Sequence, residues 1–166
     1  MSCVHSIAFL KNAVQPYAWG STTAIPRLLG IPNPTDAPQA ELWMGAHPKA
    51  PSLVETENGW MPLDALIRSR PDEVLGPRVA ADFDRMLPFL FKVLAAAKPL
   101  SLQAHPGRER AREGFERENR SGLSMGAPQR NYRDPHHKPE CVCALTPFSV
   151  LCGFRPPAEV LEKLRA

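Results

Sequence analysis

The chain has 166 residues, which is enough for one domain with a hydrophobic core of its own. Its formal net charge is +3 and no long basic block is present, so the charge does not indicate a nucleic-acid-binding protein. No apolar run is long enough to span a membrane, and the N-terminus lacks the cationic and long apolar regions of a signal peptide. We therefore expect a cytoplasmic protein with neither nucleic acid nor membrane as a partner.

The cysteine and proline content narrows the class of fold further. The four cysteines are Cys3, Cys141, Cys143 and Cys152, and no C-x-x-C motif occurs, so a disulfide framework is not expected. Cys141 and Cys143 are predicted to share one face of a strand and to lie in the core. The 19 prolines exclude long helices from much of the chain and favour short strands and turns.

The first 95 residues predict a mixture of turns, short strands and short helices. Turns and strands are expected over residues 12–47, with one strand at 41–47 that stops at Pro48. Residues 61–85 are expected to be helical from Pro62 onward, with 72–84 as a second short helical element. Residues 87–95 are almost wholly apolar and therefore predict a buried strand.

The remainder of the chain predicts two helices separated by a loop and strands. Residues 107–120 carry Glu–Arg pairs at i,i+4 spacing, which favours a solvated charged helix over a nucleic-acid or phosphate patch. A loop is expected over 121–135 and one or two strands over 139–153. A helix beginning near Pro157 has an apolar stripe and no room for a partner before the sequence ends, so we expect a fragment.

Residues 101–106 (SLQAHP) alternate polar and apolar side chains. In a strand this pattern places Ser101, Gln103 and His105 on one face, because strand side chains point to opposite sides at period two. An amide oxygen and an imidazole nitrogen would then project side by side from the backbone, as two ligands of one metal ion do. A solvated polar strand face is the simpler alternative.

A second segment, residues 136–140 (HHKPE), contains a carboxylate that can act as a third ligand. Pro139 excludes a helix interior, and in an extended backbone Lys138 and Glu140 share one face. Imidazole together with carboxylate is common in zinc sites, although an amide ligand is unusual. A surface ion pair between Lys138 and Glu140 is the alternative.

Several motifs occur together in an order that resembles a known family. They are QPYAWGS (15–21), AELWMGAHP (40–48), LPFLFKVL (87–94), SLQAHP (101–106), NYRDP (131–135) and HKPE (137–140). In this order and spacing they resemble the N-terminal region of type I mannose-6-phosphate isomerases, from about residue 12 to the last residue.

The resemblance implies a mainly β fold, namely part of a cupin-like (RmlC-like) β-barrel or jelly roll with short helices. Residues 1–155 would be the N-terminal part of the cupin-type catalytic domain, and 156–166 the start of a helical domain. It also implies a zinc-dependent aldose–ketose isomerase of carbohydrate metabolism and GDP-mannose biosynthesis, which interconverts mannose 6-phosphate and fructose 6-phosphate. One Zn²⁺ per chain would be held by Gln103, His105 and Glu140.

Further site residues follow from the same resemblance. Lys138 matches an active-site lysine and Ser101 a serine of the pocket, and we assign both to the catalytic group. Trp19 and Glu41 are pocket candidates, with aromatic packing and a surface carboxylate as their structural alternatives.

The family's fourth zinc ligand, a later histidine, and an active-site arginine and glutamate have no match in this chain. We therefore expect the 166 residues alone to be inactive, and the full-length protein to be a monomer with a small-molecule sugar phosphate as its partner. The alternative function is a non-catalytic, truncated cupin-like module that binds metal or sugar phosphate. A metal-free structural domain would need Gln103, His105 and Glu140 to lie far apart.

Overall fold

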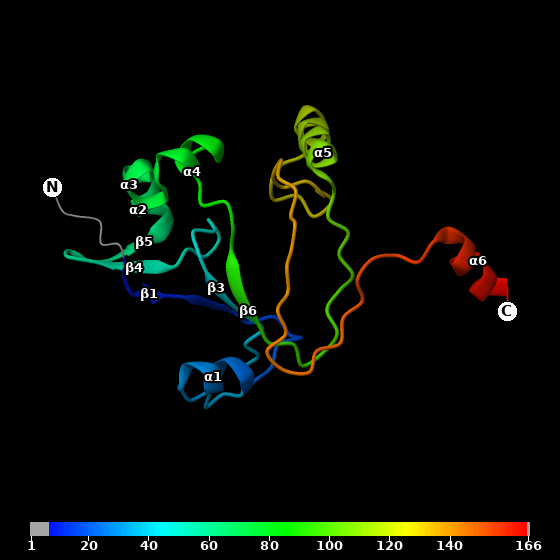
Figure 1. Ribbon diagram of the computed structural model, residues 1–166, viewed down its shortest axis with the longest axis horizontal. Helices are drawn as coiled ribbons and strands as arrows, with labels where there is room; N and C mark the ends of the chain where they lie inside the picture. Colours follow the sequence, from blue (N-terminus) through cyan, green and yellow to red (C-terminus); the bar gives the residue numbers. More distant parts are fainter. Residues whose placement is uncertain (1–6, 166) are drawn as a thin grey trace. The chain divides into compact units, whose positions relative to one another are not determined.

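The structure is a computed structural model that describes residues 7–165, so Cys3 and His5 lie outside the described residues. The chain divides into two compact units, Met1–Leu102 and Gln103–Ala166 (Figure 1). The elements in chain order are β1 (Leu10–Lys11), β2 (Ala13–Gln15), α1 (Ala24–Leu29), β3 (Glu41–Met44), β4 (Leu53–Thr56), β5 (Gly59–Pro62), α2 (Leu63–Ser69), α3 (Pro71–Leu75), α4 (Pro77–Asp82), β6 (Phe91–Leu94), α5 (Arg108–Arg120) and α6 (Pro157–Arg165).

The first unit contains two three-stranded antiparallel sheets, ordered β1-β4-β5 and β2-β3-β6. The predicted architecture of β-structure with short helices is thereby confirmed. In the second sheet, Val14 pairs with Leu42 and Leu42 with Val93, which places these side chains on one face. Ile25 of α1 is fully buried against this face, which forms the core cluster.

The opposite face of the β2-β3-β6 sheet carries the polar side chains of the sheet beside Trp43 and Leu94. Gln15 lies opposite Glu41 and Lys92 lies opposite Trp43, and residues two apart on a strand share a face. The alternation of residues 41–44 therefore places Leu42 on the core face and Glu41 and Trp43 on the opposite face.

Proline positions explain the lengths of the helices. Pro71, Pro77 and Pro157 are the first residues of α3, α4 and α6, where the missing N–H costs no helical hydrogen bond. The longest helix, α5, has 13 residues and lies where the sequence has no proline between Pro106 and Pro128. The predicted helix at 107–120, the loop at 121–135 and the helix starting near Pro157 are confirmed.

The expected strands at 101–106 and 139–153 are wrong, because neither segment forms a β-ladder in the described structure. Cys141 and Cys143 are exposed rather than in the core. The strand at 87–95 shortens to β6, where Phe91 is 61% exposed. Alternating or apolar residues indicate which face a strand would bury, but a strand also needs a hydrogen-bonded partner strand. β6 is an edge strand that pairs with β3 alone.

The division between the two units falls after Leu102, whereas the sequence placed a domain change at residue 155, which stays a prediction. Among residues 7–165, no helix has the length and apolar character needed to cross a bilayer.

Candidate metal centre

The central feature of the second unit is a contact between His105 and Glu140, two residues 35 positions apart. The imidazole Nε2 lies 3.4 Å from the carboxylate Oε1. Two donors bound to one tetrahedral zinc ion at about 2.1 Å are separated by about 3.4 Å, so the spacing suits a shared ion. The same atoms also suit a weak ion pair when the imidazole is protonated.

The site is open to solvent. The His105 side chain is 32% exposed and that of Glu140 is 60% exposed. An ion can therefore reach both donors without any opening of the structure.

A third ligand of the His, Cys, Asp or Glu type does not accompany this pair among the described residues. Among residues 7–165, no set of three His, Cys, Asp or Glu residues is arranged to hold a metal ion. Gln103 precedes His105 by two residues, is exposed, and forms no side-chain hydrogen bond to a described residue. Its amide oxygen is thus available, and its role as the third ligand stays a prediction.

Lys138 is held in place by Asp134. Its Nζ donates to Asp134 Oδ1 at 2.8 Å and Oδ2 at 2.9 Å, and to the carbonyl of His136 at 3.2 Å. The alternative of a surface ion pair between Lys138 and Glu140 is therefore wrong. Burial alone would raise the pKa of the Asp134 carboxyl. The hydrogen bonds from Lys138 and from the His136 N–H outweigh burial, so this pKa lies below its ordinary value.

The polar face of the β2-β3-β6 sheet holds a second group of functional side chains. Glu41 is 7% exposed, so it is not a surface carboxylate. Its Oε2 accepts a hydrogen bond from Trp43 Nε1 at 2.6 Å and lies 3.6 Å from Lys92 Nζ. The Lys92 ammonium also lies 5.4 Å from the centre of the Trp43 ring, in cation–π geometry.

Known proteins with similar sequences identify the family. The family model of the phosphomannose isomerase type I catalytic domain matches residues 7–157. The chain belongs to the phosphomannose isomerase type I family.

Its relatives in the phosphomannose isomerase type I family span bacteria and mammals. Mannose-6-phosphate isomerase of Salmonella typhimurium is 50% identical over 157 residues, covering 94% of this chain and 40% of the relative. The Homo sapiens enzyme is 42% identical over 165 residues, covering 94% and 36%. The chain thus spans about two fifths of the length of these relatives.

Solved structures agree with this family assignment. The Salmonella typhimurium enzyme bound to substrate (f6p) and zinc matches with a TM-score of 0.73 and 50% identity, covering 81% of this chain and 34% of that one. A zinc-bound mannose 6-phosphate isomerase matches with a TM-score of 0.72 and 50% identity, covering 78% and 33%.

Other predicted site residues of this family member lie in the first unit. Trp19 is half-buried and stacks on Tyr17 at 5.8 Å between ring centres, and its carbonyl accepts from the N–H groups of Ala97 and Lys98. Ser101 is exposed near the end of that unit, without a side-chain hydrogen bond to a described residue. Their pocket roles stay predictions.

Lys92 was missed by sequence reasoning. It is the only charged residue in the apolar run 87–95, and a lone charge in such a run was the available signal. Strand register decided its partner by placing it opposite Trp43.

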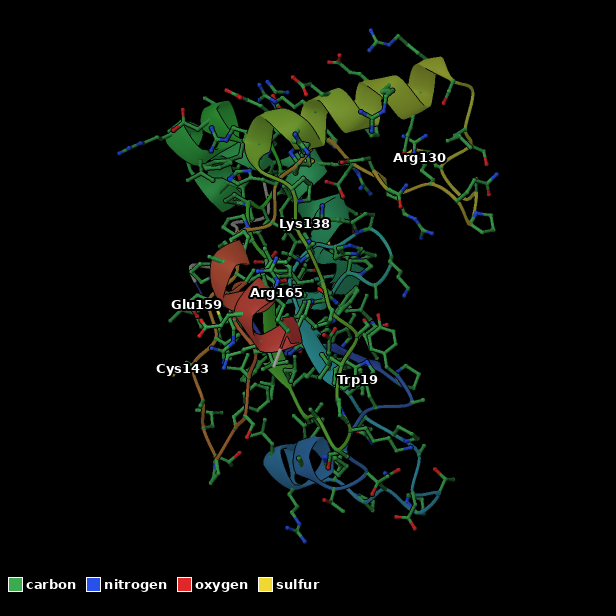
Figure 2. All side chains as sticks on the ribbon, turned by 90° about the vertical axis from the view of Figure 1, so that its right-hand side faces the viewer. Trp19, Arg130, Lys138, Cys143, Glu159 and Arg165 are labelled. Atoms are coloured by element: carbon green, nitrogen blue, oxygen red, sulfur yellow. The ribbon has the colours of Figure 1, made fainter. Side chains whose placement is uncertain are left out.

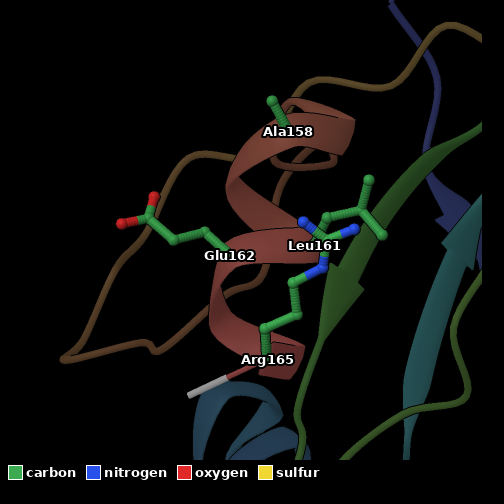
Figure 3. Close-up of a pocket in the computed structure, with 4 residues that line it drawn as sticks. All are labelled: Ala158, Leu161, Glu162 and Arg165. Carbon is green, nitrogen blue, oxygen red and sulfur yellow. The ribbon is translucent and has the colours of Figure 1, made fainter.

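A shallow groove along α6 does not belong to this site. Figure 3 shows its lining residues Ala158, Leu161, Glu162 and Arg165 on one helix face. All four come from a single helix, so no second element contributes a converging polar group.

Proposed function

We propose that this chain carries the zinc-ligand segment of a mannose-6-phosphate isomerase, which interconverts mannose 6-phosphate and fructose 6-phosphate. The observation that carries the proposal is the 3.4 Å separation of His105 Nε2 and Glu140 Oε1. Family membership and the names of the relatives support the substrate and the metal.

The proposed ligands are Gln103, His105 and Glu140. Their amide oxygen, imidazole nitrogen and carboxylate are donors that zinc accepts, and one Zn²⁺ per chain is expected. Bound zinc would act as a Lewis acid for the substrate oxygens. Aldose–ketose isomerisation moves a proton between C1 and C2 through an enediol, so negative charge on those oxygens must be stabilised.

Lys138 supplies a fixed positive charge two residues from Glu140. Asp134 holds its ammonium with two short contacts, so the charge is oriented before the substrate binds. We assign Lys138 to the developing negative charge and Ser101 to hydrogen bonding with the substrate.

The polar face around Glu41, in the first unit, is a separate candidate for contact with sugar hydroxyls. Its carboxylate is already oriented by Trp43 and Lys92, and a carboxylate–ammonium pair offers both acceptors and donors to sugar hydroxyls. Trp19 adds an aromatic surface on which the apolar face of a sugar ring can lie.

The remaining proposals concern the whole protein. A cytoplasmic location is supported by free, exposed thiols at Cys141, Cys143 and Cys152, which suit a reducing compartment. We also propose a monomeric full-length enzyme, a place in GDP-mannose biosynthesis and a domain change near residue 155.

A chimera tests the isomerase proposal. The chain replaces the matching part of the Salmonella typhimurium enzyme, and a coupled assay measures conversion of mannose 6-phosphate. We expect zinc-dependent turnover that falls by at least about 10²-fold on His105→Ala or Glu140→Ala. Glu116→Gln, on the exposed face of α5, should leave turnover unchanged.

Two outcomes would contradict the proposal. A chimera that binds zinc but shows no turnover would favour the non-catalytic metal-binding module. Full activity of the His105→Ala chimera would remove His105 from the ligand set.

A further inference from the structure

The two ligand-bearing segments are linked by α5 and the loop that follows it. Gln103 and His105 lie just before the start of α5 at Arg108, and Glu140 follows the loop of residues 121–135 (Figure 1). Neither ligand segment belongs to a sheet, so no β-ladder sets the spacing between them. Some other contact must bring the chain back from α5 toward His105.

A buried carboxylate on α5 provides one such contact. The Glu118 side chain is 9% exposed. Its Oε2 accepts from the Tyr132 N–H at 2.8 Å, and its Oε1 accepts from the Asn131 N–H at 3.3 Å. The hydrogen bond from the Tyr132 N–H lowers the pKa of the Glu118 carboxyl below its ordinary value, although burial acts in the opposite direction. Hydrogen bonds from Asn131 and the charge of Arg130 lower it further. The Glu118 carboxylate is therefore charged at neutral pH.

Arg130 provides the other contact. Its side chain is 1% exposed (Figure 2 labels it beside α5). Its Nε donates to the Tyr132 carbonyl at 2.8 Å, one Nη to the Leu123 carbonyl at 2.6 Å and the other to Asn119 Oδ1 at 2.6 Å. All three donor nitrogens are thus used to fix the loop, which is the fork geometry that lysine cannot reproduce.

The two side chains meet in one clamp on Tyr132. Arg130 Nε lies 3.9 Å from Glu118 Oε2, and the guanidinium lies 5.1 Å from the centre of the Phe115 ring. Glu118 accepts a hydrogen bond from the Tyr132 N–H, and Arg130 donates one to the Tyr132 carbonyl. The backbone of Tyr132 is therefore held on both sides, a few residues before Asp134, Lys138 and Glu140.

We propose that Glu118 and Arg130 are positioning residues of the metal centre, because their clamp on Tyr132 returns the segment of Glu140 to His105. The inference rests on the proposed function for the identity of the metal. A mutation of such a supporting contact typically weakens metal binding by about 10–100-fold.

Zinc affinity of the 166-residue chain is the first test, measured by competition with a chromophoric chelator. Glu118→Gln and Arg130→Lys should weaken binding at least about tenfold, since glutamine turns one acceptor into a donor and lysine lacks the fork. Glu116→Gln is the matched control on the same helix and should bind zinc like the parent. Far-UV circular dichroism verifies that each variant is folded.

A second measurement does not depend on zinc. The four cysteines are replaced by serine, His105→Cys and Glu140→Cys receive nitroxide labels, and dipolar broadening of the spectrum reports whether the labels stay close. The doubly labelled chain that keeps Glu118 should show the broadening. The same chain with Glu118→Gln should lose it, and Arg130→Lys replaces that variant if Glu118→Gln does not fold.

The outcomes separate the two proposals. Folded clamp variants that keep parental zinc affinity and parental broadening would overturn the positioning role. A parent chain that shows the broadening but does not bind zinc would overturn the metal centre, while loss of broadening in the variants would still support the clamp.

Discussion

The ring of Tyr132 lies directly on the backbone of Gly114 in α5. A Cβ added at Gly114 would stand 2.5 Å from two ring carbons, much closer than side chains ever approach. The absence of a side chain at Gly114 thus allows the loop that carries Tyr132 to pack on the helix.

Gly114→Ala should therefore destabilise the chain, although alanine ordinarily stabilises a helix interior. The helical gain of about 1 kcal/mol is outweighed by overpacking, which costs about 1–3 kcal/mol, so the free energy of unfolding falls by up to about 2 kcal/mol. Urea denaturation measures the change. Gly126→Ala is the control, because nothing lies within 4 Å of its added Cβ, and a stabilised Gly114→Ala chain would contradict the packing argument.

Trp43→Phe tests the hydrogen bond that orients Glu41. Phenylalanine keeps an aromatic ring but removes the Nε1 donor, which leaves a buried carboxylate with one partner fewer. We expect a loss of about 1–3 kcal/mol in the free energy of unfolding, measured with urea. Trp60→Phe, at a tryptophan that is 38% exposed, should cost much less. Equal losses in both variants would show that the hydrogen bond to Glu41 contributes nothing specific.

Asp134 should make stability depend on acidity. Its pKa is lower in the folded than in the unfolded chain, because the hydrogen bonds from Lys138 and His136 outweigh the opposing effect of burial. The stabilisation is therefore complete above the unfolded-state pKa of about 3.9 and is lost as the pH falls through the folded-state pKa. Urea unfolding between neutral pH and pH 3 measures this loss.

Two variants assign the acid dependence to the ion pair. Asp134→Asn and Lys138→Met should each reduce the loss of stability on acidification, and the double variant should add little to either. Unchanged acid dependence in Asp134→Asn would mean that other carboxylates are responsible.

Zinc should stabilise the folded chain if it binds at His105 and Glu140. A ligand that binds only the folded state, at a free concentration about 100 times its Kd, raises the free energy of unfolding by about 2.7 kcal/mol. Thermal unfolding should accordingly shift upward with zinc and return on chelation. Magnesium, which prefers oxygen ligands, should have little effect. A His105→Ala chain that is still stabilised to the same extent would place the ion elsewhere.

Local features of the chain were readable from the sequence. The prolines predicted short helices and the start of α6 at Pro157, since the effect of proline acts on its own turn. The gap between Pro106 and Pro128 allowed the long charged helix α5. The family motifs indicated Gln103, His105 and Glu140 as ligands, because residue type and order are properties of the sequence itself.

Only the tertiary structure decided which charged and polar side chains meet. In the structure, Lys138 pairs with Asp134 and not with Glu140. Glu41 is buried beside Trp43 and Lys92. Glu118 and Arg130 both bind the backbone of Tyr132. It also left residues 101–106 and 139–153 without the strands that their patterns predicted. A pattern fixes which way a side chain faces relative to its neighbours in sequence, whereas hydrogen-bonded partners and burial depend on the packing of segments many residues apart.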